Sequence, residues 1–91
     1  MPLFVLICRD KPGALAVRQA NREAHLTYAQ GSCAVVLGGP FLDEGGAMCG
    51  SMLVIEAEDR AAAESWAAGD PYNKAGLFES VRIDAWKRVI G

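Results

Sequence analysis

The sequence predicts an α+β domain in the order β-α-β-β-α-β, the ferredoxin-like split arrangement. Two observations predict this order: short apolar or alternating segments occupy the strand positions, and two segments with helical periodicity lie between them. In this fold both helices cover one face of a four-stranded antiparallel sheet. The length of 91 residues fits one compact unit. We therefore expect a single domain over residues 1–91.

The first half of the chain predicts a strand, a helix and a second strand. Leu3–Cys8 is apolar at every position, as in a strand buried on both faces. A turn at residues 10–13 follows, and the helix is expected from Pro12 to about Gln30, with Gly31 ending it. Cys33–Gly38 is again apolar and predicts the second strand.

The second half predicts a hairpin partner, a helix and a last strand. Pro40–Met48 is a polar, flexible connection to a third strand over Ser51–Ala57. Asp59 is the expected N-cap of a second helix, which ends at Gly69 because Asp70-Pro71 prevents its continuation. A loop is expected next, and then an alternating, half-exposed strand over Val81–Trp86.

Composition points to a second copy as a partner. Hydrophobic residues make up 52% of the chain, more than a small monomer needs. The helices leave one sheet face uncovered, and the first three strands are apolar at consecutive positions. A homodimer that packs sheet on sheet would cover that face. The alternative is a monomer with an exposed patch rich in Met and Cys.

Charge and cysteine content bound the partners and the location. A net charge of −2 gives no attractive field for nucleic acid. The N-terminal apolar run is too short to span a membrane, and it lacks the flanks of a signal peptide. Three cysteines, Cys8, Cys33 and Cys49, show no C-x-x-C spacing. Reduced thiols in a cytoplasmic protein explain them most simply.

Motifs for common cofactors are missing. The glycine runs do not form a phosphate loop or a Gly-x-Gly-x-x-Gly fingerprint, and no zinc spacing or Gly-x-Ser-x-Gly elbow is present. We expect no metal or organic cofactor.

His25, the only histidine, is the first candidate for chemistry. At about 100° per residue it lies on the helix side opposite Gln19, Glu23 and Thr27, where a core helix should be apolar. This face therefore lines a wet pocket, or the chain supplies a buried partner. Imidazole suits a general acid or base near neutral pH. The alternative is a core histidine with only a structural role.

A catalytic histidine usually has a carboxylate that orients it. The candidates are Asp70, Asp43, Glu44 and Glu23. Asp70 is the most constrained, because it lies between Gly69 and Pro71. The alternative is that Asp70 is only a turn residue, as Asp-Pro often is.

Four more residues could complete a pocket. Arg18 and Arg22 share the helix stripe of His25 and could bind a carboxylate or another oxyanion. A solvated basic stripe, or ion pairs with Asp43 and Glu44, is the alternative, and it is favoured for Arg18. Tyr72 could donate from its hydroxyl or simply pack. Ser51 could donate a hydrogen bond or merely begin a strand.

Several short motifs together resemble the YCII-related (YciI-like) family over nearly the whole chain. They are Arg22-Glu23-Ala24-His25-Leu26, Gly38-Gly39-Pro40, Gly50-Ser51, Asp70-Pro71-Tyr72, Ala75-Gly76-Leu77 and a last strand ending near Trp86. Each motif alone is weak, whereas their order and spacing together are fairly specific.

The resemblance implies a dimeric α+β barrel and a site built on a histidine–aspartate pair. Carried over, the pair is His25 and Asp70, with Ser51 and the Gly39-Pro40 backbone as pocket walls. Elimination or isomerisation of small, oxygenated, ring-derived acids is the implied chemistry. A lyase- or isomerase-like enzyme would use His25 as base, Asp70 to orient it and Arg22 to bind an anionic group.

Two other functions stay open. The same pocket could bind a small ligand without catalysis, or the chain could be a dimerisation module with a structural histidine–carboxylate contact. The pairing also has a geometric condition, because the two helices run antiparallel and their C-terminal ends lie apart. The pair would meet only if the first helix ends early, the loop after Gly69 folds back, or a second copy completes the site.

Overall fold

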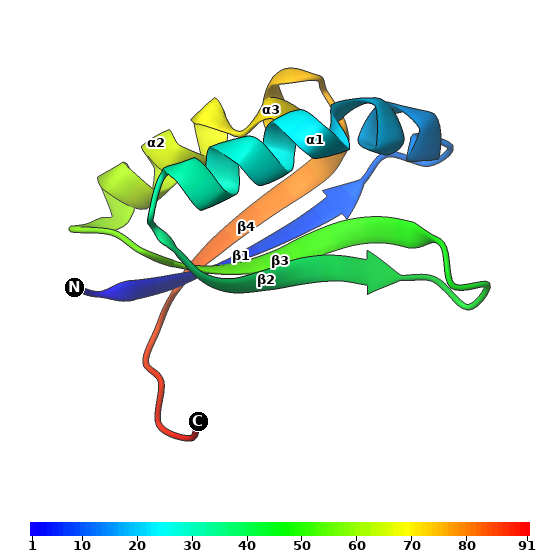
Figure 1. The fold of residues 1–91 in the computed structure, drawn as a ribbon. Helices are drawn as coiled ribbons and strands as arrows, with labels where there is room; N and C mark the ends of the chain where they lie inside the picture. The colour runs from blue at the N-terminus through cyan, green and yellow to red at the C-terminus, as the bar shows by residue number, and fades with distance from the viewer.

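The computed structural model describes residues 1–91 as an antiparallel sheet with all helices on one face (Figure 1). The elements are β1 (Leu3–Asp10), α1 (Leu15–Gly31), β2 (Val35–Leu42), β3 (Met48–Glu56), α2 (Arg60–Gly69), α3 (Pro71–Lys74) and β4 (Phe78–Trp86). The strand order is β2-β3-β1-β4, and every neighbouring pair is antiparallel. The predicted split arrangement is confirmed.

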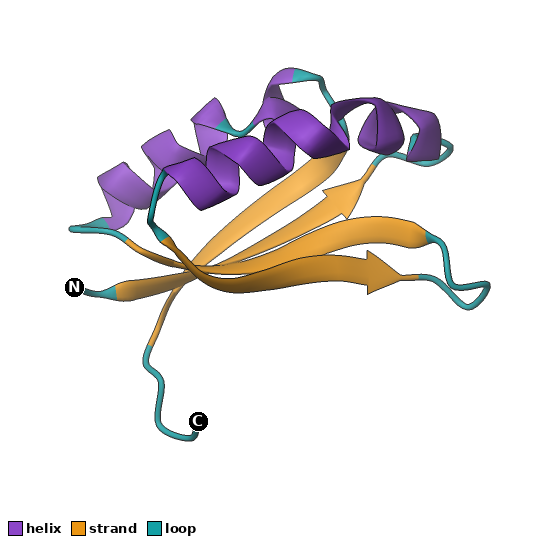
Figure 2. Cartoon of the chain, in the orientation of Figure 1, coloured by secondary structure: helices purple, strands orange, loops and turns teal.

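Figure 2 shows the helices as one layer above the sheet. The core residues lie between these two layers. Period-two alternation in β1 turns Phe4, Leu6 and Cys8 toward the helices, where they are buried. The alternate residues of β1, which are Leu3, Val5 and Ile7, are only half-buried on the opposite face. The expectation that this strand is buried on both faces is therefore wrong for the single chain.

Helix boundaries follow the local signals closely. The first helix begins at Leu15 instead of Pro12, because residues 12–13 form a turn in which Gly13 has φ 71°. The second helix has the predicted N-cap, since the Asp59 carboxylate accepts a hydrogen bond from the Ala62 amide at 2.8 Å. No helix has both the length and the apolar character needed to cross a membrane.

The hairpin is longer than the sequence suggests. Gly38-Gly39-Pro40 lies inside β2, whereas the sequence placed it after the strand. Proline cannot donate to a ladder, but β2 is an edge strand and tolerates it. The connection shrinks to residues 43–47, where the Asp43 carboxylate accepts hydrogen bonds from two backbone amides.

The region after α2 also differs from the expectation. Residues 71–74 form the short helix α3, where the sequence suggested a loop. The last strand begins at Phe78, three residues before the predicted Val81. The short helix arises at the Asp70-Pro71 pair, because an Asp N-cap followed by Pro at the first helical position starts a helix as readily as it ends one.

Candidate active site

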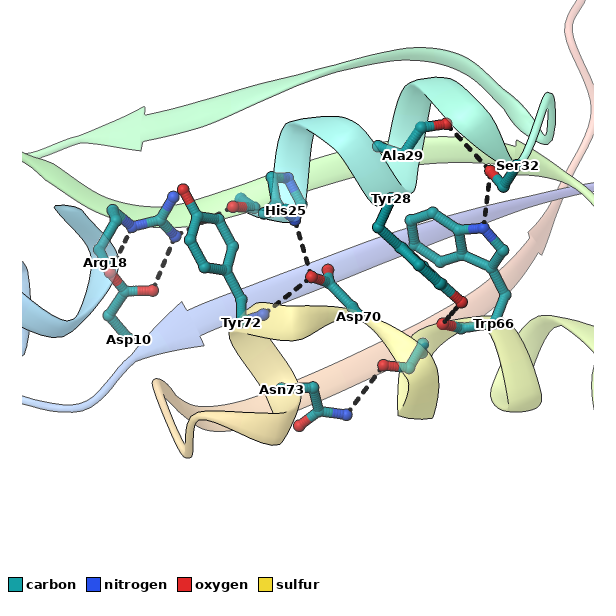
Figure 3. Close-up of polar contacts among 12 residues, drawn as sticks. Asp10, Arg18, His25, Tyr28, Ala29, Ser32, Trp66, Asp70, Tyr72 and Asn73 are labelled. Carbon is teal, nitrogen blue, oxygen red and sulfur yellow. Dashed lines mark hydrogen bonds and ion pairs between the residues drawn. The ribbon is translucent and has the colours of Figure 1, made fainter. Parts of the chain in front are cut away.

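A buried histidine–aspartate pair links α1 to the end of α2. His25 Nδ1 lies 2.7 Å from Asp70 Oδ1 (Figure 3). Only 7% of His25 and 2% of Asp70 is exposed. The two residues therefore meet within one chain, and the other candidate carboxylates do not contact this ring.

The unequal lengths of the helices bring the pair together. The first helix has 17 residues and the antiparallel α2 only 10, so α2 ends beside the second half of α1. The Tyr28 hydroxyl donates to the Trp66 carbonyl at 2.8 Å across the same contact. A Cβ at Gly69 would lie 2.6 Å from that hydroxyl, so glycine permits the close approach. Neither an early end of α1 nor a second copy is needed.

Asp70 has a structural role as well. Its Oδ1 also accepts a hydrogen bond from the Tyr72 amide at 2.9 Å, which caps α3. Asp70 is therefore both the turn residue that one interpretation suggested and the partner of His25. An ionised carboxylate only accepts, so it favours the imidazole tautomer with its proton on Nδ1. The Nε2 lone pair is then left for another partner.

Tyr72 fixes the plane of the imidazole. Its ring stacks on His25 with centroids 4.0 Å apart and planes 13° from parallel. The Arg18 guanidinium lies 4.7 Å from the Tyr72 centroid, and Figure 3 shows the phenol ring between the two side chains. Burial raises the pKa of Tyr72, against the opposing charges of Arg18 and Arg22. The ring packs as one alternative suggested, and a donor role for its hydroxyl stays a prediction.

Arg18 corrects one expectation from the sequence. It is 2% exposed, so it belongs to neither a solvated stripe nor ion pairs with Asp43 and Glu44. Its Nε and Nη2 lie 2.7 and 2.8 Å from the two carboxylate oxygens of Asp10. Burial acts to lower the pKa of Arg18, but the hydrogen bonds and charge of Asp10 raise it overall.

Asp10 is a site residue that the sequence analysis did not single out. It was assigned only to the turn after the first strand. Its signal is weak: a lone carboxylate at the end of an apolar strand. The burial of Arg18 had a stronger signal, which the sequence analysis did not follow: Arg18 lies seven residues before His25, and that spacing returns to the same helix face.

The histidine borders a cavity of about 220 Å³ between α1 and the β2–β3 hairpin. Its polar lining comes from Arg18, Arg22, His25, Gln30, Ser51 and Tyr72. Its other lining comes from Leu26, Val35, Gly38, Gly39, Pro40, Met48 and Leu53. All the other predicted site residues line this cavity, and Asp70 reaches it through His25. Gln30, which was expected only as the approximate end of the first helix, lines it as well.

The remaining predicted residues occupy distinct parts of the cavity. Arg22 is exposed and forms no ion pair within the chain, so it is a free cation at the opening. Gly39 contributes backbone from the edge strand. Ser51 is the fourth residue of β3, not its first, and its hydroxyl accepts a hydrogen bond from Arg18 Nη2 at 2.9 Å. No group of three or more His, Cys, Asp or Glu side chains is arranged to hold a metal ion.

Comparison with known proteins agrees with the resemblance seen in the motifs. The YCII-related domain matches residues 2–87. The chain belongs to this family. The YciI proteins of Escherichia coli and Shigella flexneri are 34% identical to it, over 96% of this chain and 98% of theirs. An uncharacterized protein of Haemophilus influenzae is 30% identical, over 94% and 97%.

Solved structures with the same fold include an enzyme whose sequence identity to this chain is comparable to that of the YciI proteins. The dehydrochlorinase TftG of Burkholderia phenoliruptrix AC1100 acts on 5-chloro-2-hydroxyhydroquinone and was solved with 2,5-dihydroxybenzoquinone. It is 36% identical, covers 96% of this chain and 95% of its own, and superposes with a TM-score of 0.87. An antibiotic biosynthesis monooxygenase, at 14% identity and a TM-score of 0.61 over 99% of this chain and all of its own, shares the fold alone.

Proposed function

We propose that this YCII-related protein is a lyase- or isomerase-type enzyme that moves a proton on a small, anionic, ring-derived compound. The observation that carries the proposal is the buried His25–Asp70 hydrogen bond at the wall of a cavity. A base held by a carboxylate, with its second nitrogen unused, is the arrangement that general acid–base catalysis requires.

In this mechanism Nε2 of His25 takes a proton from the substrate. The electron pair of the broken bond moves into the ring system. There it either expels a leaving group or binds a proton at another atom of the substrate. Asp70 stabilises the imidazolium that forms, and Tyr72 keeps the ring in one plane. Arg22 attracts the anionic group of the substrate to the opening.

The size of the cavity supports a substrate with one ring. A volume of about 220 Å³ exceeds the cavity of about 150 Å³ that is known to hold benzene. It is smaller than the range of about 300–1,000 Å³ typical for drug-sized ligands. The substrate in the name of the similar dehydrochlorinase is also a hydroxylated single ring. We therefore choose 5-chloro-2-hydroxyhydroquinone as the first probe.

The test is chloride release from this probe by the unaltered chain and by two variants. His25→Gln removes the base, and Asp70→Asn removes the charge that stabilises the imidazolium. Each should lower kcat by about 10²–10⁴-fold. Glu23→Gln is the matched control, because this carboxylate lies on the exposed side of α1 and should keep the rate. No release by the unaltered chain, or full rates in both site variants, would contradict the proposal.

A second candidate function is ligand binding without catalysis. It is favoured by the contacts of Asp70, which fix α1 to α2 and α3 whether or not a proton is moved. A protein of this kind would bind the probe or 2,5-dihydroxybenzoquinone without releasing chloride. A pure dimerisation module would bind neither compound.

We also infer that two copies pack through the open sheet face. On this face Leu3, Val5 and Ile7 of β1 and Met52 of β3 are half-buried in the single chain, and Val54 of β3, beside Val5, is already buried. An apolar strip in the centre of a sheet is unfavourable in water, and a second copy offers the same strip in return.

The three cysteines are free thiols, and the cytoplasmic location stays a prediction.

A further inference from the structure

The Ser51 hydroxyl lies on the sheet side of the cavity, and His25 lies on the helix side. Ser51 is 3% exposed and belongs to the alternation of β3 that turns Leu53 and Ile55 toward the helices. Its neighbours in register are Cys8 on β1 and Pro40 on β2. The hydroxyl forms one hydrogen bond within the chain, with Arg18.

The direction of that hydrogen bond is fixed by chemistry. A guanidinium can only donate, so the Ser51 oxygen accepts and keeps its own hydrogen for another acceptor. The guanidinium cannot turn away, because Asp10 binds Nε and Nη2 in a fork. Since the cavity is the space that Ser51 lines, a ligand oxygen there is the natural acceptor.

We propose that Ser51 is a catalytic residue whose hydroxyl donates a hydrogen bond to the substrate oxygen on which negative charge develops. Arg18 and Asp10 position the Ser51 hydroxyl. The inference rests on the proposed function and extends it. When His25 takes the proton, the electron pair is delocalised onto an oxygen bonded to the neighbouring ring carbon, and it then returns to expel the leaving group or to bind a proton at another atom. That oxygen becomes more negative in the transition state, and a preorganised donor there lowers the barrier.

Arg18 lines the cavity as well as Ser51, but it is buried and already paired with Asp10. The charge of Arg18 is balanced by Asp10, so it adds little net attraction for an anion. Accepting from a guanidinium polarises the hydroxyl, which makes it a stronger hydrogen-bond donor. Arg22, which is exposed and unpaired, serves the net charge of the ligand instead.

This division predicts the chemical class of the substrate. It carries a carbonyl, phenol or enol oxygen adjacent to the carbon or hydroxyl that loses the proton. It also carries a second anionic oxygen that reaches Arg22. Hydroxylated quinones and hydroquinones with one ring have both features.

The test compares Ser51→Ala with Ser51→Thr, which restores a hydroxyl, and with Ser65→Ala, which removes an exposed hydroxyl on α2. The readouts are kcat and KM for 5-chloro-2-hydroxyhydroquinone. Loss of a donor to developing charge should lower kcat of Ser51→Ala by about 10²–10³-fold. KM should change by less than about threefold, because binding of the substrate in its ground state depends less on the Ser51 hydrogen bond than the transition state does. Ser51→Thr should recover most of kcat, and Ser65→Ala should equal the unaltered chain.

A double variant separates positioning from general damage. Arg18→Lys keeps a positive charge but loses the fork to Asp10, and it should lower kcat as Ser51→Ala does. If Arg18 acts through Ser51, the Arg18→Lys/Ser51→Ala chain should lose no more than the worse single variant. Losses that multiply would overturn the positioning role of Arg18.

The outcomes also separate this inference from the proposed function. An unchanged kcat in Ser51→Ala, with activity lost in His25→Gln, would overturn the role of Ser51 and leave the proton transfer intact. Full activity in His25→Gln, or none in the unaltered chain, would overturn both.

Discussion

A histidine on the buried side of a helix requires a polar partner, and this requirement could be derived from the sequence. Burial of an unpaired imidazole costs free energy, so the lone His25 indicated a pocket or a carboxylate nearby. The structure contains both. Asp70 could be chosen among the candidate carboxylates because its place before Pro71 constrains it. The Arg18–Asp10 pair could not be predicted from the sequence, because it depends on how a turn of four residues directs the helix over the strand.

Cys8 is the buried group whose titration gives the clearest prediction at the residue scale. Burial raises the pKa of its thiol to about 12, with Asp70 and Asp10 adding to the effect and Arg18 opposing it. Between pH 9 and the folded pKa, the unfolded chain therefore loses this proton and the folded chain keeps it. Stability should fall as the pH rises, by up to about 1.4 kcal/mol per pH unit from this group.

Urea unfolding at pH 8 and pH 10.5 measures the effect. Cys8→Ala should show a smaller loss of unfolding free energy over this interval than the unaltered chain. Cys33→Ala, which removes an exposed thiol, should show the same loss as the unaltered chain. Tyr28 and Tyr72, whose pKa burial also raises, contribute equally to all three chains. Equal losses in Cys8→Ala and the unaltered chain would contradict the prediction.

At the scale of elements, the order and type of strands and long helices could be predicted, but several bounds could not. Gly38-Gly39-Pro40 looks like a turn in isolation, and only its place on an edge strand makes it compatible with β2. The helix α3 was hidden because an Asp-Pro pair can end one helix and cap the next. The bounds of α2, which the sequence did predict, matter most for the site, since the short α2 is what brings Asp70 beside His25.

At the scale of the whole molecule, the two faces of the sheet have opposite environments. The helices cover one face, and the other is open in the single chain, as Figure 1 shows. The residues after β4 leave the sheet on this open side. The apolar content that the sequence showed is therefore divided between a core within the chain and a strip that a second copy would bury.

Sedimentation at micromolar concentration tests the dimer. The unaltered chain should sediment at twice the 9.7 kDa mass of one chain. Met52→Glu places a charge in the centre of the open strip and should shift the protein toward the single chain, with the fold retained by circular dichroism. Thr27→Glu, on the exposed side of α1, should leave the mass unchanged. A species of 9.7 kDa alone in the unaltered chain would remove the dimer.

The central claim is that Asp70 holds His25 with its proton on Nδ1 and its free lone pair on Nε2, toward the cavity. Nitrogen-15 NMR of the single histidine at pH 8 tests it directly. We expect a protonated, pyrrole-type signal for Nδ1 and an unprotonated, pyridine-type signal for Nε2. Adding 2,5-dihydroxybenzoquinone should shift the Nε2 signal most. In Asp70→Asn the preference should weaken or reverse. A proton found on Nε2 in the unaltered chain, or an Nε2 signal unmoved by the bound quinone, would contradict the account.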